Sequence, residues 1–575
     1  MAKICQLEIQ NFRSIREMSW APSVGINCLV GPGDSGKSTI LDAIDLCLGA
    51  RRSVAFGDAD FHDLDITRPI VISATLDGLP DELLNLDSYG DFLRGFDPAT
   101  GRVEEEPRKG IPTVLTLRLM VTADFEPVWA LYSERAERAE LERGLAWKDR
   151  ALLAPARIGS FVNSNLSWSR NSVLNRLTED RADLGAQLAA AARQARTNFG
   201  DRADAQLADA LAIVTQVANR LGVPVGTSAK ALLDAHSVSI GDGAIALHNE
   251  AGIPLRSLGT GSSRLLVAGL QREAAGSASI ALVDEVEYGL EPHRLARLLD
   301  SLGAKEEMPN LQVFMTSHSP VALRELTANQ VFIVRSQRGL HCVQRVGAVD
   351  GIQGMLRKDA EAFLAKSVIV CEGASEVGFG RGLDQFWVEE GHISFFALGG
   401  AYVDTGGSEP DRCFERGSAL LKLGYRVLVL ADSDKPPTPA VVKAFHDAGG
   451  DSVVWRPTRA LEDELFQSLS DEAIGALLTK ATENLGRDLI NEHIKSKSGG
   501  KVDLSAVELE QILDGFSVGT RTLLGIASRT KGNGWFKSLP AFQDVAKEIV
   551  GPHLATADTD FQELINKYQA WIHAA

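Results

Sequence analysis

The sequence predicts a multidomain protein of the α/β class, in which buried strands alternate with helices. The chain has 575 residues, which is longer than the chain that a single hydrophobic core usually supports. Short apolar runs bounded by glycine or polar residues recur in two separate series. An Ala/Leu-rich stretch over about 165–235, typical of long helices, interrupts the first series. We therefore expect a first domain divided by a helical insertion, followed by a second α/β domain.

The composition is that of an ordinary globular chain, with 45% hydrophobic and 23% charged residues. No run of about 18 apolar residues appears, so no membrane span is expected. The amino terminus alternates polar and apolar residues, which is unlike a secretory signal and typical of a strand. The six cysteines lie far apart without a C-x-x-C pair. These features predict a cytoplasmic protein with no membrane partner.

The formal net charge of −17 argues against a general nucleic-acid coat, because phosphate binding usually needs a basic surface. It does not exclude a local site, since carboxylates that hold divalent cations attract phosphate once the cations are bound. The alternative is that the charge only keeps the protein soluble.

The elements follow from apolar runs and their period. In the first series we expect a helix over 38–48 and strands over 4–9, 26–30, 70–76, 113–121, 238–247, 280–283, 313–315 and 331–334. In the second series we expect strands over 367–371, 393–398, 427–430 and 452–455, with mainly helices beyond about 470. The predicted domains are residues 1–163 and 238–350 for the two parts of the first domain, 164–237 for the insertion and 360–575 for the second domain.

A glycine-rich loop lies between the strand predicted at 26–30 and the helix predicted at 38–48. Its sequence GPGDSGKS matches G-x-x-x-x-G-K-[ST], the P-loop pattern. Glycines let backbone N–H groups surround phosphate oxygens, the lysine reaches the β and γ phosphates, and the serine hydroxyl binds Mg²⁺. The loop therefore predicts an ATP site formed by Gly31, Gly33, Asp34, Ser35, Gly36, Lys37, Ser38 and Thr39. A plain glycine-rich turn is the alternative.

The second half of an ATP site is a carboxylate at the end of an apolar strand, and Asp284 follows the run 280–283. Asp284 is expected to hold Mg²⁺ together with Ser38. Glu285 is expected to polarise the attacking water, and His318, after the run 313–315, to contact that water or the γ-phosphate. Taken alone, His318 is more often a structural histidine.

These segments, in this order, resemble the ABC-type ATPases of the SMC-like group. The matching residues are QLEIQNFRS at 6–14, the P-loop, DEVEYGLEP at 284–292 and TSHS at 316–319. The resemblance implies a homodimer in which a signature segment of a second protomer completes the site. SLGTGSSR at 257–264 is similar to that segment, although Gly259 stands where serine is usual and Thr260 or Ser262 would have to substitute. The alternative for the segment 257–264 is a Gly/Ser loop that caps a helix. The alternative for the insertion is a helical core within one chain that does not form a dimer.

Four carboxylates follow strands of the second series. Glu372 follows the strand at 367–371, and Glu376 comes four residues later, where a helix is expected. Asp432 and Asp434 follow the strand near 427–430 at a spacing of two, which directs them to one side. The carboxyl ends of neighbouring strands converge, and such oxygen ligands suit Mg²⁺, Mn²⁺ or Ca²⁺. Two such ions assist phosphodiester cleavage.

This order of carboxylates resembles a Toprim domain. The whole arrangement, a P-loop ATPase with a helical insertion followed by a Toprim domain, resembles the OLD (overcoming lysogenization defect) family of nucleases. That family includes the Gabija-type anti-phage nucleases. The resemblance implies metal-dependent cleavage of DNA, with the ATPase and the insertion supporting dimerisation and control. It also implies ligands for a second metal ion, and Glu462 and Glu464 are the matching candidates. It further implies a lysine that contacts the scissile phosphate, for which Lys537 is preferred over Lys531. The alternatives are the acidic first turn of a helix and two plain surface lysines.

The resulting prediction is an ATP-binding, divalent-metal-dependent DNA endonuclease, with a helicase partner left open. One alternative is an SMC-like ATPase scaffold that binds DNA or partner proteins without cleaving. Another is a primase or topoisomerase, although no zinc-ligand cluster and no separate domain with a catalytic tyrosine is recognisable. Retention of all four carboxylates favours the nuclease.

Overall fold

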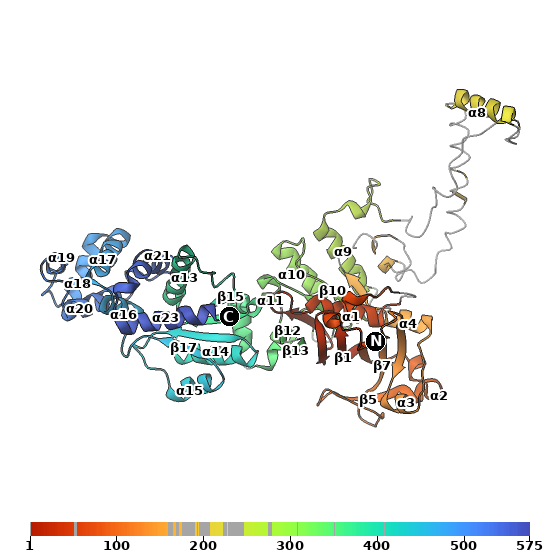
Figure 1. The fold of residues 1–575 in the computed structure, drawn as a ribbon, viewed down its shortest axis with the longest axis horizontal. Helices are drawn as coiled ribbons and strands as arrows, with labels where there is room; N and C mark the ends of the chain where they lie inside the picture. The colour runs from red at the N-terminus through yellow and green to blue at the C-terminus, as the bar shows by residue number, and fades with distance from the viewer. Residues whose placement is uncertain are drawn as a thin grey trace.

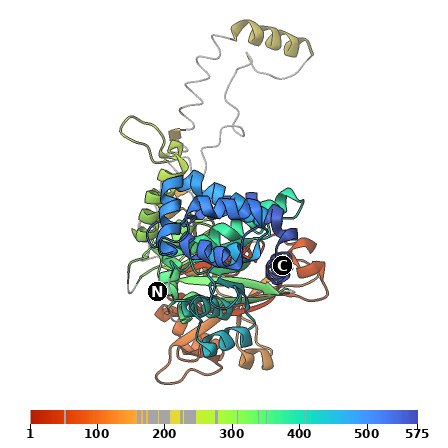
Figure 2. The same ribbon diagram turned by 90° about the vertical axis from the view of Figure 1, so that its left-hand side faces the viewer.

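The computed structural model describes residues 2–50, 54–158, 165–167, 172–174, 190–191, 194, 207–221, 227, 246–273, 279–306, 309–337, 339–349, 351–407 and 409–574. Most of the predicted insertion 164–237 lies outside these residues. Its helix α8 (Ala208–Leu221) is described and lies apart from both sheets (Figures 1 and 2). Among the helices of the described ranges, none combines the length and the apolar character of a membrane span.

The first domain is built on one large sheet. Its strands are β1 (Lys3–Phe12), β2 (Ile15–Trp20), β3 (Ile26–Val30), β4 (Ile70–Asp77), β5 (Leu93–Asp97), β6 (Arg102–Glu104), β7 (Thr113–Val121), β8 (Pro127–Tyr132), β9 (Ala156–Ile158), β10 (Ile280–Val283), β11 (Gln312–Thr316), β12 (Val331–Gln337) and β13 (Leu340–Arg345). Their order is β6-β5-β7-β4-β1-β2-β13-β12-β3-β11-β10-β9, and β8 pairs with β7. The neighbours β9, β10, β11, β3 and β12 run parallel, so their carboxyl ends meet at one edge.

Helix α1 (Lys37–Leu48) begins directly after the P-loop and packs on this sheet. Its buried residues, among them Ile40 and Ile44, join a core with the inward-facing residues of β1 and β4. The other helices that the structure describes in this domain are α2 (Leu86–Tyr89), α3 (Glu134–Arg138), α4 (Trp147–Leu153), α9 (Thr260–Glu273), α10 (Pro292–Ser301), α11 (Pro320–Glu325) and α12 (Ile352–Lys358). The central strand β3 is wholly buried, as expected of a parallel strand covered on both faces.

The second domain contains a parallel sheet of order β15-β14-β16-β17. Its strands are β14 (Ser367–Cys371), β15 (Gly400–Asp404), β16 (Arg426–Ala431) and β17 (Asp451–Val454). Its helices are α13 (Ala374–Glu389), α14 (Asp411–Lys422), α15 (Pro439–Asp447), α16 (Leu461–Ser468), α17 (Asp471–Leu485), α18 (Arg487–Lys497), α19 (Leu504–Leu513), α20 (Val518–Ser528), α21 (Leu539–Val545), α22 (Gly551–His553) and α23 (Thr559–His573). Helices α17 to α21 gather at the end of the molecule distant from the first sheet (Figure 1).

Helix α13 approaches α21 more closely than side chains usually allow. A β-carbon added at Gly378 would lie 2.3 Å from the carbonyl oxygen of Leu539, and one added at Gly382 would lie 2.2 Å from that of Gln543. The two helices therefore meet backbone to backbone at glycines. Residues near the end of the chain thus hold the helix that follows β14.

One hydrophobic core joins the two domains. It contains Val313 of β11 and Ile333 of β12 from the first sheet, and Val368 of β14 and Val427 of β16 from the second. The two sheets are therefore packed against common side chains rather than only connected by a linker.

Most sequence-predicted elements are confirmed within one or two residues, and those at 26–30, 113–121, 280–283 and 367–371 have the predicted bounds. The strand predicted at 238–247 lies mostly outside the described residues. The strand predicted at 393–398 is wrong: this segment forms turns closed by backbone bonds such as Leu398 N–H to Ser394 O, and the strand β15 comes after it. Its apolar residues Ile393 and Phe396 are 61% and 50% exposed, so they do not belong to a buried strand.

Candidate functional site

The P-loop has the backbone of a phosphate-binding turn. Gly31, Asp34 and Gly36 have positive φ angles of 149°, 58° and 84°. Lys37 is buried, and its Nζ donates to Pro32 O at 2.8 Å and to Gly31 O at 3.2 Å. Burial lowers the pKa of Lys37, against the opposing effect of the Asp34 and Asp284 charges. The ammonium group is thus held inside the loop, where a phosphate would replace weak carbonyl acceptors.

Strands β3, β10 and β11 bring the predicted magnesium ligands together. Ser38 Oγ donates to Asp284 Oδ1 at 3.1 Å, and Thr316 Oγ1 donates to the same oxygen at 2.6 Å. A serine hydroxyl and a carboxylate at the edge of a P-loop are the ligands that Mg²⁺ takes with ATP. This donor pair therefore fits Mg²⁺.

Glu285 has a strained backbone with φ of 46°, and its N–H donates to Thr316 Oγ1 at 2.8 Å. A non-glycine residue in the left-handed region is uncommon and concentrates at functional sites. The conformation places the side chain of Glu285, which is exposed, at the same strand edge as Asp284. Its role at the attacking water stays a prediction.

His318 is exposed, and its backbone N–H donates to Glu287 Oε1 at 2.6 Å. The other oxygen of Glu287 accepts from Ser317 Oγ at 2.9 Å. Among the described residues, the imidazole of His318 has no hydrogen bond to Asp284 or Glu285, so its predicted role stays a prediction. The sequence analysis assigned no role to Glu287. Its carboxylate binds Ser317 and the backbone of His318 and so fixes the segment that carries His318.

The predicted signature segment lies beside Asp284. Arg264 is buried, and its guanidinium donates to the carbonyl oxygens of Asp284, Glu285 and Tyr288 at 3.2, 3.0 and 2.8 Å. Helix α9 begins at Thr260, so the segment runs into the first turn of a helix, where the N–H of Ser263 donates to Gly259 O at 3.1 Å. Arg264 therefore connects this helix to the strand end that carries Asp284 and Glu285.

In the second domain, three of the predicted carboxylates lie where parallel strands end. Glu372 Oε2 accepts the N–H of Asp432 at 3.2 Å, which links the ends of β14 and β16. Asp432 Oδ1 accepts the N–H of Leu461 at 2.9 Å, which links the end of β16 to the start of α16. Glu376 Oε2 accepts the N–H of Gly373 at 2.8 Å. The fold thus brings Glu372 and Asp432, which are 60 positions apart, to one sheet edge.

Burial and mutual repulsion disfavour ionisation of this group. Burial, followed by the charges of Glu462 and Glu372, raises the pKa of Glu376 to about 8. The pKa of Asp432 is raised well above its usual value by burial and then by Glu376, Glu372 and Glu462. Ionisation of several such carboxylates at once is unfavourable unless a cation binds between them or one of them keeps its proton.

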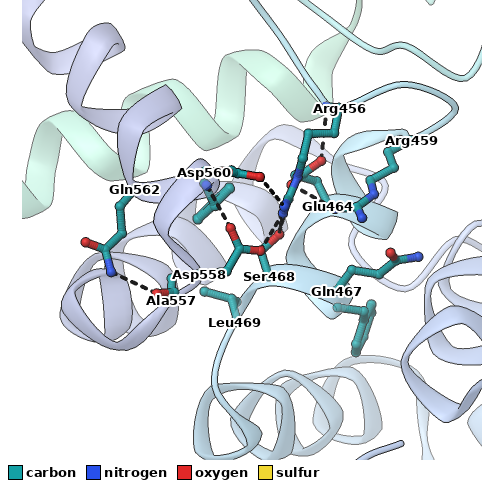
Figure 3. A network of polar contacts seen from close by, with 12 residues as sticks. Arg456, Arg459, Glu464, Gln467, Ser468, Leu469, Ala557, Asp558, Asp560 and Gln562 are labelled. Carbon is teal, nitrogen blue, oxygen red and sulfur yellow. Dashed lines mark hydrogen bonds and ion pairs between the residues drawn. The ribbon is translucent and has the colours of Figure 1, made fainter. Parts of the chain in front are cut away.

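Glu462 belongs to this group, but Glu464 does not. Glu464 is wholly buried, and its Oε1 accepts from Arg456 Nε at 2.7 Å, from Arg459 Nη1 at 3.2 Å and from Ser468 Oγ at 2.8 Å (Figure 3). Its Oε2 accepts the N–H of Arg456 at 3.1 Å. Oε1 is therefore occupied by an ion pair and Oε2 by a backbone N–H, an arrangement that does not favour Glu464 as a metal ligand, and its predicted role stays a prediction.

The ion-pair network around Glu464 also reaches the last helix. Arg456 Nη2 lies 2.5 Å from Asp558 Oδ2, and Asp558 Oδ1 accepts the N–H of Phe561 at 2.9 Å, which caps the start of α23 (Figure 3). The turn after β17, the helix α16 and the helix α23 are therefore tied through one guanidinium group.

The basic stretch after α20 contributes an arginine that the sequence analysis did not select. Arg529 bridges Asp434 at 3.2 Å and Asp463 at 2.8 Å. Lys537 is exposed and its charge lowers the pKa of Glu462, which burial raises, so it lies within electrostatic range of the carboxylates. Lys531 is exposed, with no ion pair in the described part of the chain. Of the two predicted lysines, the position of Lys537 agrees better with a role at a phosphate.

The donor chemistry of Glu372, Glu376, Asp432 and Glu462 suits a hard divalent cation. Within the described residues, however, no three His, Cys, Asp or Glu side chains converge closely enough to form a ready-made metal site. The residues therefore fit Mg²⁺ or Mn²⁺ in chemistry and burial, and their side chains would have to rotate inward to bind it.

Comparison with known proteins defines the class of the first domain. A family model described as "AAA domain, putative AbiEii toxin, Type IV TA system" matches residues 139–324, and one described as "AAA domain" matches residues 6–72. The second match contains the P-loop, and the first contains Asp284 and Glu285. The chain therefore contains an AAA/ABC-type P-loop ATPase domain that binds ATP.

Curated relatives match over a short segment. The chain is 47% identical to the DNA replication and repair protein RecF of Prosthecochloris aestuarii over 45 residues, which are 8% of this chain and 12% of that protein. It is 36% identical to RecF of Chlorobium limicola over 58 residues, which are 10% of this chain and 16% of that protein. The chain thus spans less than a fifth of the length of these relatives.

Solved structures that are similar include the Smc head domain of Pyrococcus furiosus bound to the C-terminal domain of ScpA, at 16% identity and a TM-score of 0.34, over 60% of this chain and 96% of that chain. The SMC head domain of Thermotoga maritima is similar at 14% identity and a TM-score of 0.27, over 60% of this chain and 98% of that chain. Likeness at this level carries no information on activity or partners.

Proposed function

We propose that this protein is an ATP-binding, divalent-metal-dependent DNA endonuclease, with a Toprim-like nuclease domain over 360–575 as in the OLD family. The observation that supports it most is the carboxylate group at the ends of β14 and β16, in which Glu376 and Glu462 are buried and Glu372 and Asp432 are half-buried. A stable fold rarely buries several carboxylates at one strand edge without a use for their charge. The proposed substrate is DNA and the proposed assembly is a homodimer through the insertion at 164–237; a helicase partner stays a prediction.

In the proposed reaction, Glu372, Glu376 and Asp432 would hold one cation and Asp432, Asp434 and Glu462 a second. Such cations supply charge stabilisation at the attacking and leaving oxygens of a phosphodiester. The backbone bonds from Asp432 N–H to Glu372 and from Leu461 N–H to Asp432 orient one oxygen of each carboxylate and leave the other directed elsewhere. Lys537 would contact the scissile phosphate as a mobile surface cation.

The competing proposal is an SMC-like ATPase scaffold that binds DNA or partner proteins without cleaving. One observation favours it: Arg529 already neutralises Asp434 and Asp463, as in a site that has lost its cations. In the nuclease proposal Arg529 instead releases Asp434 when a cation binds. The two proposals therefore differ in whether metal binds at all.

We expect purified protein to nick or cut DNA with Mg²⁺ or Mn²⁺, and Glu372→Ala and Asp432→Ala to lower the rate at least about 100-fold, since metal ligation supplies several kcal/mol of transition-state stabilisation. Cleavage of supercoiled and linear DNA with Mg²⁺, Mn²⁺ or Ca²⁺, with and without ATP, measures this. Asp447→Ala is the matched control, because Asp447 is an exposed carboxylate of the same domain paired with Lys443 at 2.6 Å.

The control variant should cut like the wild type. If no metal supports cleavage while ATP hydrolysis is intact, the nuclease proposal fails and the scaffold is favoured. If the carboxylate variants cut as well as the wild type, the activity belongs to another site or to a contaminant.

A further inference from the structure

The hairpin formed by β12 and β13 touches both ends of the P-loop. A β-carbon added at Gly31 would lie 2.5 Å from the carbonyl oxygen of Val334 in β12. One added at Gly36 would lie 2.8 Å from Nε2 and 3.1 Å from Cδ2 of His341 in β13. The loop and the hairpin are therefore in direct contact at two glycines, and neither can move toward the other without displacing it.

His341 is the side chain that makes the second contact. It is 7% exposed, and its Nδ1 lies 3.0 Å from the carbonyl oxygen of Gly339. Burial lowers the pKa of His341, and hydrogen bonding to the backbone of Gly339 and of Ser35 in the P-loop opposes this effect. A shift of the P-loop therefore changes the surroundings of this buried ring directly.

The same hairpin also contacts the second domain. The guanidinium carbon of Arg335 lies 4.0 Å from the centroid of the Tyr425 ring, and Arg335 Nη2 donates to Ala365 O at 3.5 Å. Gln344 Nε2 donates to Lys422 O at 2.9 Å. Arg335 follows Val334 directly in the chain. One short hairpin therefore bridges the P-loop and the turn between α14 and β16.

Tyr425 precedes the strand that carries two of the proposed metal ligands. Tyr425 is 3% exposed, its hydroxyl donates to Phe363 O at 2.7 Å, and β16 begins at the next residue and ends just before Asp432. From Val427 onward this strand is buried, and it pairs with β14, which ends just before Glu372. At about 3.3 Å per residue, the strand covers roughly 20 Å between Tyr425 and the carboxylates. A buried strand transmits a shift at one end because its neighbours leave no space to absorb it.

We propose that the β12–β13 hairpin couples nucleotide binding at the P-loop to the geometry of the carboxylate group, through His341 on one side and the Arg335–Tyr425 contact on the other. This inference rests on the proposed function for its effect on cleavage, while the coupling itself does not depend on it. Nucleotide phosphates fix the backbone of the P-loop, the hairpin follows the loop, and Tyr425 carries the displacement into β16. In this proposal the hairpin would take up two positions, one with and one without nucleotide, as such coupling requires.

The test uses the full chain with two changes at the bridge, Arg335→Met and Tyr425→Leu. The matched controls are Arg345→Met, on the same hairpin with its guanidinium over Phe332, and Tyr425→Phe, which keeps the ring and loses only the hydroxyl. Hydrogen exchange of the amides in 31–39, 331–345 and 425–434 is measured with and without a non-hydrolysable ATP analogue and Mg²⁺, and DNA cleavage is measured on the same samples. Thermal unfolding confirms that each variant is folded.

In the wild type and both controls, the analogue is expected to change exchange at 425–434 by roughly fivefold or more, the lower end of typical allosteric coupling. In Arg335→Met and Tyr425→Leu, the change at 31–39 should persist and the change at 425–434 should disappear, together with any dependence of cleavage on ATP. A wild type in which exchange changes only at 31–39, or bridge variants that keep the change at 425–434, would overturn the proposal. Coupled exchange without cleavage under any metal would support the coupling and refute only the nuclease.

Discussion

Replacing Lys37 with alanine is expected to lower kcat/KM for ATP by roughly 10² to 10³-fold, the usual cost of losing one preorganised positive donor. Lys37 is 6% exposed, and the loop holds its ammonium group between Pro32 O and Gly31 O, so no neighbouring side chain of the P-loop carries a charge that replaces it. Steady-state ATP hydrolysis and binding of a fluorescent ATP analogue measure the two effects separately.

The matched control is Lys305→Ala, since Lys305 is an exposed lysine of the same domain paired with Asp300 at 2.9 Å. It should hydrolyse ATP at the wild-type rate. Wild-type binding and hydrolysis in Lys37→Ala would contradict the assignment of the P-loop as the nucleotide site.

Replacing Arg456 with methionine is expected to destabilise the second domain by about 3 kcal/mol or more, because it leaves the wholly buried Glu464 without its main partner. Arg459 remains 3.2 Å from Glu464 in this variant. Because one positive partner is kept, the decrease in the free energy of unfolding is expected near the lower end of the usual range for a broken buried ion pair. The contact with Asp558 at the start of α23 is lost in the same variant. Urea unfolding of the second domain within the full chain measures the change in free energy.

A double change, Arg456→Met with Glu464→Leu, should recover much of the loss, because no buried charge then stays unpaired. Arg487→Met is the surface control: Arg487 and Glu508 are 56% and 38% exposed at their side chains, and such pairs contribute about 1 kcal/mol or less. A double variant as unstable as the single one would show that the arginine acts by packing rather than by charge.

Three of the four strands whose observed bounds match the predicted ones are parallel strands, and the fourth, β7, is antiparallel. The strands at 26–30 and 367–371 are short apolar runs that end at a glycine or a carboxylate, and burial on both faces leaves no other place for such runs. The run at 393–398 looks similar, yet Ile393 and Phe396 face outward, and the strand forms instead from the less apolar GAYVD of β15. Apolar content alone does not tell a buried run from one that folds back as a turn.

The carboxylate group shows the same limit at the level of single residues. Asp432 and Asp434 follow a strand, where a spacing of two directs side chains to one side. Glu462 and Glu464 share that spacing but lie in α16, where residues two apart are rotated by about 200°. Only Glu462 therefore faces the group, whereas the sequence analysis selected both residues. The bond between Arg529 and Asp434 joins residues 95 positions apart and follows from the packing of α20, which no local pattern reveals.

Helices α13 and α16 are held by contacts with the last helices of the chain. These contacts also determine the order in which the two sites can fold during translation. The ATPase domain has all its strands once β13 is synthesised, and domains generally fold in that order as the chain emerges. The carboxylate group acquires its support only after α21 has packed on Gly378 and Asp558 has reached Arg456. A ribosome that stops before residue 558 is therefore expected to release a chain with an assembled nucleotide site and an unfinished second site, and the proposed cleavage would be the last property that a nascent molecule gains.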